Sequence, residues 1–235
     1  MGAPLTDITI YEGLIKREKE ALRDRFREIS VFVCDLYHYR LNGYKPPKTS
    51  RICLTVEEDL PDVGFSFGSI HSMSIRINGQ DFFNRNTQEQ LDMVLDTVHR
   101  SCLLLSDQFG WDKRPFQNAY QSILNDNYNF IIRYPPKKSR DRKVNLTVVV
   151  EKNITESVLK LEVQTANGTV IDKIVSKLNG GCCDSIYVLA KNTKWINSDT
   201  IGFFLLDKKR YISYSLTERT TTFNFNIAYV PVSWF

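Results

Sequence analysis

The hydrophobic pattern of this chain changes from a helical to a strand-like period near Tyr128, and this change limits the folds available to it. Two segments before that residue, 87–109 and 113–125, carry apolar side chains at helical spacing. After it, short runs of β-branched and aromatic residues alternate with turn residues. The sequence therefore predicts an α+β protein, in which a mixed domain precedes an all-β domain.

Both helical segments carry signals for their ends. Thr87-x-x-Gln90 has the form of a capping box, and Gly110 is expected to end the first helix. Asp112 precedes the second helix, and Pro115 fits its first turn because a proline has no amide hydrogen to leave unsatisfied there.

A third, charged helix is predicted over 11–29, where Ile15, Leu22, Phe26 and Ile29 lie along one stripe. Apolar and aromatic runs at 30–41, 51–57 and 65–77 are separated by turn residues and predict three antiparallel strands. The N-terminal domain is thus expected to combine a three-stranded antiparallel sheet with three helices.

Strand-like runs dominate the rest of the chain, at 128–134, 143–151, 157–165, 169–177, 185–191, 200–207, 210–216 and 221–230. Asn167-Gly168 lies between two of them and is a strong hairpin signal. Short strands at this spacing favour a sandwich-like domain or a barrel.

Two prolines and a charged stretch at 135–142 predict a basic linker between the domains. The expected organisation is an α+β domain at 1–134, the linker at 135–142 and an all-β domain at 143–235. A core shared by both domains, with Val144–Val150 extending the first sheet, is the alternative.

The net charge of +4 is small, but its distribution is uneven. Residues 126–235 carry 16 basic and 10 acidic side chains, and much of the excess lies in one run at 133–143. A second segment, at 37–48, interleaves aromatic and basic residues that could stack on bases and contact phosphates. The candidate contact residues for a partner or a nucleic acid are Tyr37, Tyr39, Arg40, Tyr44, Arg133, Lys137, Lys138, Arg140, Arg142 and Lys143.

The five cysteines have no regular spacing, so they do not predict a disulfide framework. With neither a signal-peptide pattern nor an apolar run long enough to span a membrane, a cytoplasmic protein is expected. Cys182 and Cys183 follow two glycines in an unusual turn. That turn could present a catalytic thiol, or it could be a hairpin turn with two partly buried thiols.

Four titratable residues fall on one face of the helix at 87–109, namely Glu89, Asp92, Asp96 and His99. Asp96-x-x-His99 has the spacing of half a carboxylate–histidine metal site, but the second half is missing. An exposed ion pair between Asp96 and Arg100 is the simpler interpretation. We predict no metal, no cofactor and no catalytic residue.

The expected function is that of a protein-binding module rather than an enzyme. The chain lacks the phosphate-loop, Rossmann, nucleophile-elbow and zinc-helix motifs, and it is rich in aromatic residues that suit protein interfaces. A specific hypothesis is an immunity-type protein that neutralises a cognate toxin. The alternative is a nucleic-acid-binding protein or an enzyme that uses the basic segment 133–143 and the Cys182-Cys183 turn.

Overall fold

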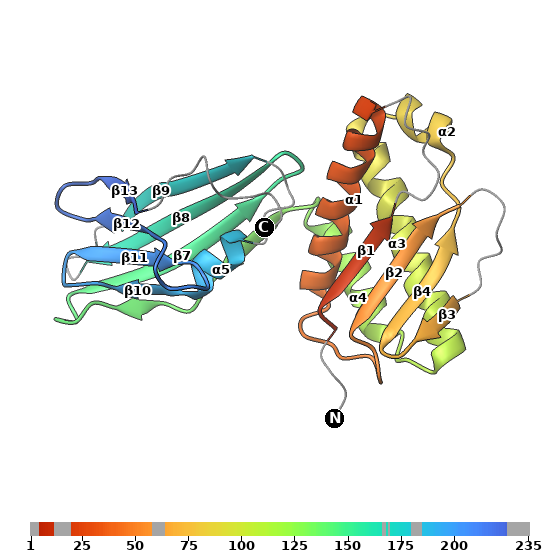
Figure 1. The fold of residues 1–235 in the computed structure, drawn as a ribbon, viewed down its shortest axis with the longest axis horizontal. Helices are drawn as coiled ribbons and strands as arrows, with labels where there is room; N and C mark the ends of the chain where they lie inside the picture. Colours follow the sequence, from red (N-terminus) through yellow and green to blue (C-terminus); the bar gives the residue numbers. More distant parts are fainter. Residues whose placement is uncertain are drawn as a thin grey trace. The chain divides into compact units, whose positions relative to one another are not determined.

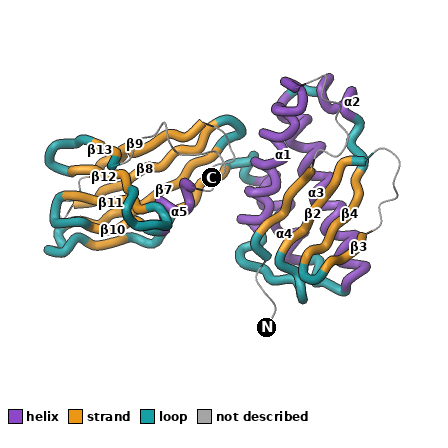
Figure 2. Tube along the Cα trace, in the orientation of Figure 1, coloured by secondary structure: helices purple, strands orange, loops and turns teal. Residues whose placement is uncertain are grey.

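The computed structural model describes residues 5–11, 20–57, 64–165, 168, 170–179 and 185–224. The chain divides into two compact units, Met1–Asn129 (unit 1) and Phe130–Phe235 (unit 2). Longer helices accompany a sheet in unit 1, whereas strands dominate unit 2 (Figures 1 and 2). The protein is therefore a mixed α+β fold, as the sequence predicts.

Unit 1 contains a four-stranded sheet with the order β1-β2-β4-β3. Its strands are β1 (Asp7–Tyr11), β2 (Arg51–Val56), β3 (Gly64–Phe67) and β4 (Ile70–Ile75). β1, β2 and β4 are parallel to one another, and only β3 is antiparallel to its neighbour. The expected three-stranded antiparallel sheet is wrong: β2 and β4, from two of the predicted strands, pair in parallel. β1 and β2 are also parallel, and a helix connects them, as parallel strands require a crossover.

That helix is α1 (Glu20–Arg40), and it replaces the strand expected at 30–41. The apolar stripe that begins at Phe26 and Ile29 continues at helical spacing through Val33 and Leu36, all of which are buried. Aromatic and β-branched residues in this segment resemble a strand in composition, but their period of burial is that of a helix.

Three further helices follow in unit 1, namely α2 (Gly79–Asn84), α3 (Thr87–Phe109) and α4 (Arg114–Asn125). The capping box of α3 lies one residue earlier than predicted, since Asn86 and Glu89 cap each other's backbone. Gly110 ends α3 in the left-handed conformation, as expected. Pro115 lies in the first turn of α4, also as expected.

The helices cover one face of the sheet, and α3 and α4 lie behind it in Figure 1. Alternate strand residues are buried on this covered face, and in the pairing register they form rows such as Ile10, Leu54 and Met73. The intervening residues point to the opposite face, on which no described helix packs.

The edge strand β3 approaches α3 very closely at Gly64. A Cβ atom there would lie 2.6 Å from both Gln108 Oε1 and Leu105 Cδ2. The Gln108 side chain also donates to the Gly64 carbonyl oxygen at 2.7 Å, which occupies an acceptor at the sheet edge. A side chain at position 64 would therefore require the Gln108 and Leu105 side chains to move.

Unit 2 contains two sheets. A five-stranded sheet has β5 (Phe130–Arg133), β7 (Val144–Lys152), β8 (Glu156–Thr165) and β9 (Val170–Asn179) in this order, with β6 (Lys137–Lys138) also paired to β7. A four-stranded sheet has β10 (Thr193–Trp195), β11 (Thr200–Phe204), β12 (Tyr211–Ser215) and β13 (Thr221–Phe223). All described pairs are antiparallel, including β8 and β9, which flank the Asn167-Gly168 signal.

One hydrophobic core joins the two sheets, with Val148 and Leu161 from the first and Phe203 and Ile212 from the second. The short helix α5 (Ser185–Lys191) also contributes to it and replaces the strand expected at 185–191. Ile186, Leu189 and Ala190 are buried at the i, i+3, i+4 spacing of a helix, although a short apolar run alone is equally compatible with a strand.

The segment expected to end the first domain and form a linker belongs to unit 2. Phe130–Arg133 pairs with one end of β7, and Lys137–Lys138 pairs with the other. Lys152, also on β7, is only 7% exposed and lies with its Nζ atom 5.5 Å from the Phe130 ring centroid and 4.8 Å from that of Tyr187. Its ammonium group thereby holds the first strand of unit 2 against α5.

A histidine of unit 1 is buried between aromatic rings. His71 is 5% exposed, its ring lies edge-on to those of Phe109 and Trp111, and neither ring nitrogen has a hydrogen-bond partner among the described residues. Burial lowers the pKa of His71 below its ordinary value of 6.5. The unfolded chain therefore binds more protons than the folded chain near and below that pH.

We predict that the unfolding free energy of the full chain falls as the pH drops from 7.5 to 5.5, because His71 is held neutral in the folded state. His71→Phe should reduce this loss, since a phenyl ring fills the site without binding a proton. Urea unfolding at the two pH values measures it. An equal loss in the wild type and the variant would contradict the assignment to His71.

Candidate functional site

Three tyrosines from different segments of unit 1 each hold one titratable side chain on the same face of α3. Tyr128 donates to Asp92 Oδ1 at 2.7 Å, and Tyr120 donates to Asp96 Oδ1 at 2.7 Å. Tyr37 on α1 lies 2.9 Å from the third side chain, His99 Nδ1. Asp96 is therefore bonded to a tyrosine on α4.

The hydrogen bonds assign the protonation of His99. The Tyr37 hydroxyl donates its single proton to the Phe116 carbonyl oxygen at 3.1 Å, so in this arrangement the bond to His99 is donated by Nδ1–H. The neutral ring then keeps its lone pair on Nε2. Because burial lowers the pKa of His99, the neutral ring is favoured, and Nε2 is a proton acceptor.

The same contacts keep the tyrosines protonated. The hydrogen bond to Asp96, followed by burial, raises the pKa of Tyr120 to about 12. Burial first, and then the bond to Asp92, raises the pKa of Tyr128 well above its ordinary value. His99 also stacks on Tyr120, with ring centroids 4.3 Å apart. This cluster of Tyr37, Asp92, Asp96, His99, Tyr120 and Tyr128 is called the tyrosine cluster below.

A pocket of about 300 Å³ adjoins the tyrosine cluster along α3 and is lined by Arg85, Glu89, Asp92, Met93, Asp96 and Thr97. Arg85 is engaged by Asp81, and Glu89 by its own helix cap. Over the described part of the chain, no three His, Cys, Asp or Glu side chains are grouped to hold a metal ion. The pocket is therefore acidic, with its groups largely engaged in structural bonds.

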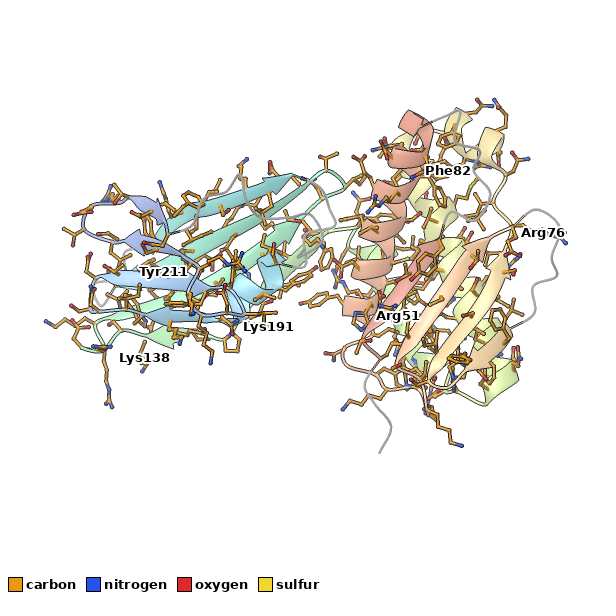
Figure 3. All side chains as sticks on the ribbon, in the orientation of Figure 1. Arg51, Arg76, Phe82, Lys138, Lys191 and Tyr211 are labelled. Atoms are coloured by element: carbon orange, nitrogen blue, oxygen red, sulfur yellow. The ribbon has the colours of Figure 1, made fainter. Side chains whose placement is uncertain are left out.

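We call the sheet face on which no described helix packs the open face. Its side chains are those of Asp7, Thr9, Tyr11, Arg51, Cys53, Thr55, Phe65, Phe67, Ile70, Ser72 and Ser74. Arg51, labelled in Figure 3, pairs with Asp7 at 3.0 Å.

One half of the open face is aromatic. Phe67 is 82% exposed and Phe65 60% exposed, although both belong to a regular strand. In the pairing register Phe67 lies opposite Ile70, and Phe65 lies opposite Ser72. Two neighbouring phenylalanines with most of their surface in water are a costly feature for an isolated domain, since each loses the stabilisation that burial would give.

Sequence analysis did not find this patch, because it placed Phe65 and Phe67 on a predicted strand without assigning the face they occupy. The alternation of side chains along a strand shows that Phe65 and Phe67 lie on the same face of the sheet. It does not show which of the two faces the helices cover. That outcome depends on the tertiary packing of α1 and α3.

The aromatic-basic segment predicted as a contact site mostly makes internal contacts. Tyr37 is fully buried, and the Tyr44 hydroxyl accepts from the Asp112 amide at 3.1 Å. Arg40 bonds Ser122, Asn129 and Asp126, and so ties the end of α1 to the end of α4. Tyr39 is 41% exposed.

The basic segment at 133–143 divides into two groups. Arg133 pairs with Glu162, and Lys137 donates to the Thr193 carbonyl oxygen at 2.5 Å. The side chains of Lys138, Arg140, Arg142 and Lys143 are exposed around the turn between β6 and β7. Cys182 and Cys183 lie outside the described residues.

We predict that Tyr120→Phe lowers the unfolding free energy by about 0.5–1 kcal/mol at neutral pH, because Asp96 loses a hydrogen bond. The wild type should also lose stability as the pH rises from 10 towards 12, because folding retains the Tyr120 proton that the unfolded chain releases. The variant should show a weaker alkaline loss. Urea unfolding at pH 8 and 11 measures both effects. Tyr211→Phe is the control, since its hydroxyl has no hydrogen bond within the described chain, and an equal effect there would contradict the prediction.

No helix among the described residues is long and apolar enough to cross a membrane. Comparisons with protein-family models, curated proteins and solved structures give no match for this chain. Its function is therefore inferred from its own geometry.

Proposed function

We propose that this chain is a protein-binding module and that the open face of unit 1 is its contact surface. The observation that supports this proposal is the exposure of Phe65 and Phe67, side by side on β3. Aromatic side chains concentrate in the cores of protein interfaces, where burying them stabilises the complex.

The composition of the open face specifies the chemistry of the partner. Phe65, Phe67 and Ile70 form an apolar patch on the β3 side of the face, which calls for aliphatic or aromatic side chains on the other protein. Arg51 and Asp7 lie further across the sheet and give the surface a polar margin. Apolar side chains bordered by polar ones are common in protein interfaces.

The partner is expected to use this face more than the β3 edge. Strand addition needs a row of free backbone groups on the outer strand. β3 has only four residues, and Gln108 already occupies the Gly64 carbonyl oxygen. Side-chain packing on Phe65 and Phe67 is therefore the main contribution to binding.

A photo-reactive phenylalanine analogue at position 67 should cross-link to a partner protein in the cells that naturally produce the chain. The analogue resembles phenylalanine, and an exposed site tolerates it. The matched control is the same analogue at Leu206, which is 79% exposed in unit 2. Mass spectrometry of the adducts measures the outcome. Equal adducts at both positions, or none at position 67, would overturn the proposal.

An immunity-type protein that occludes a cognate toxin is the specific form of this function that we propose. Occlusion requires an exposed contact surface and no reaction at it, which the aromatic half of the open face can provide. The partner's apolar contact surface would then include residues that the toxin needs for its activity.

If a neighbouring gene encodes a toxic protein, co-expression of this chain should restore growth. The double variant Phe65→Ser/Phe67→Ser should lose that protection, because the apolar contact is removed, whereas Leu206→Ser should keep it. Colony counts measure the effect, and circular dichroism checks that both variants fold. Protection that survives in the folded double variant would place the toxin contact elsewhere.

A further inference from the structure

Side-chain hydrogen bonds organise the turn between β6 and β7, which carries several basic side chains. Ser139 is buried, and its Oγ donates to Asp141 Oδ1 at 2.6 Å and accepts from the Val144 amide at 3.1 Å. The Lys143 amide also donates to Asp141 Oδ1. These bonds lower the pKa of Asp141, and the bond from Ser139 contributes most. The carboxylate therefore stays ionised and acts as the hydrogen-bond acceptor inside the turn.

The basic side chains of this turn are exposed and available to a ligand. Arg140, Arg142 and Lys143 lie in the turn itself, and Lys138 lies on β6 just before it, as labelled in Figure 3. Within the described chain their side chains have no hydrogen bond or ion pair. These four residues are called the basic hairpin below.

The backbone of this turn includes one arginine in an uncommon conformation. Arg142 has φ +60°, a left-handed conformation that glycine and asparagine adopt more easily than arginine. An arginine at such a position adds strain without a stabilising contact inside the described structure. Six other non-glycine residues of the described chain also have a positive φ, among them Lys208 in the turn between β11 and β12.

The charge of unit 2 favours an anionic ligand. Residues 130–235 carry 16 basic and 9 acidic side chains, whereas residues 1–129 carry 15 basic and 18 acidic ones. Phosphates repeat regularly along a nucleic-acid strand, and arginine side chains bind them in a bidentate manner. Two arginines and two lysines around one turn can therefore contact successive phosphates.

We propose that the basic hairpin of unit 2 binds the sugar-phosphate backbone of single-stranded nucleic acid. This activity is separate from the protein contact proposed for unit 1. Lys137 and Arg133 are not part of it, because their charged groups are engaged by Thr193 and Glu162.

The test is fluorescence-anisotropy binding of the full chain to labelled oligothymidylate, with salt varied between about 50 and 200 mM. Arg140→Ser/Arg142→Ser should weaken binding about tenfold at the lower salt. It should also reduce the slope of log K against log salt by about 1.4, since each lost phosphate contact contributes about 0.7. The control is Lys208→Ser/Lys209→Ser, which removes the same charge from the exposed turn between β11 and β12 and should change the slope little.

Arg142→Gly provides a second variant whose folding is not in question. It should unfold at a higher temperature than the wild type, because the strain is relieved, and it should still bind the oligonucleotide more weakly. The proposal is overturned if the wild type does not bind at low salt or if both double variants weaken binding equally. It is also overturned if a poly-glutamate peptide of similar length competes as well as the oligonucleotide, since the site would then recognise an acidic protein.

Discussion

The packing of helices against a single face of the unit 1 sheet is the constraint on which the rest of that unit depends. β1 and β2 are parallel and are connected by α1, and β4 also pairs in parallel with β2. The helices α1, α3 and α4 pack against one another over the apolar rows of the strands. The opposite face receives no helix from the described chain. Its polar centre and its exposed phenylalanines follow from this arrangement, and so does the protein-binding role that we propose.

The tyrosine cluster illustrates how polar groups are accommodated in the same helical layer. Asp92, Asp96 and His99 lie on successive turns of α3, and each is bonded by the hydroxyl of a different tyrosine. A hydroxyl satisfies such a group while its ring adds apolar area to the packing. The cluster therefore links α1, α3 and α4 into one layer. This structural role accounts for the presence of Asp96 and His99, whose spacing otherwise resembles half of a metal site.

Sequence periodicity predicted the elements whose burial follows one clear pattern. α3 and α4 were located within a residue or two, and most strands of unit 2 were recognised from alternation and turn residues. The segments 30–41 and 185–191 were wrong, because β-branched and aromatic residues were given more weight than helical spacing. The open face could not be predicted, because the covered side of Phe65 and Phe67 depends on contacts between elements far apart in the sequence.

The lysine that lies over Phe130 and Tyr187 has a consequence for dissecting the chain. A fragment that starts at residue 143 would keep Lys152 but lose Phe130 and both short strands that flank β7. The Lys152 ammonium group would then have lost one of its two aromatic neighbours. The two stretches of β7 that pair with β5 and β6 would become an unpaired sheet edge, which is prone to self-association. A fragment of unit 2 that starts at Phe130 keeps the contacts of Lys152 with both aromatic rings and the two short strands, so unit 2 should be expressed from that residue.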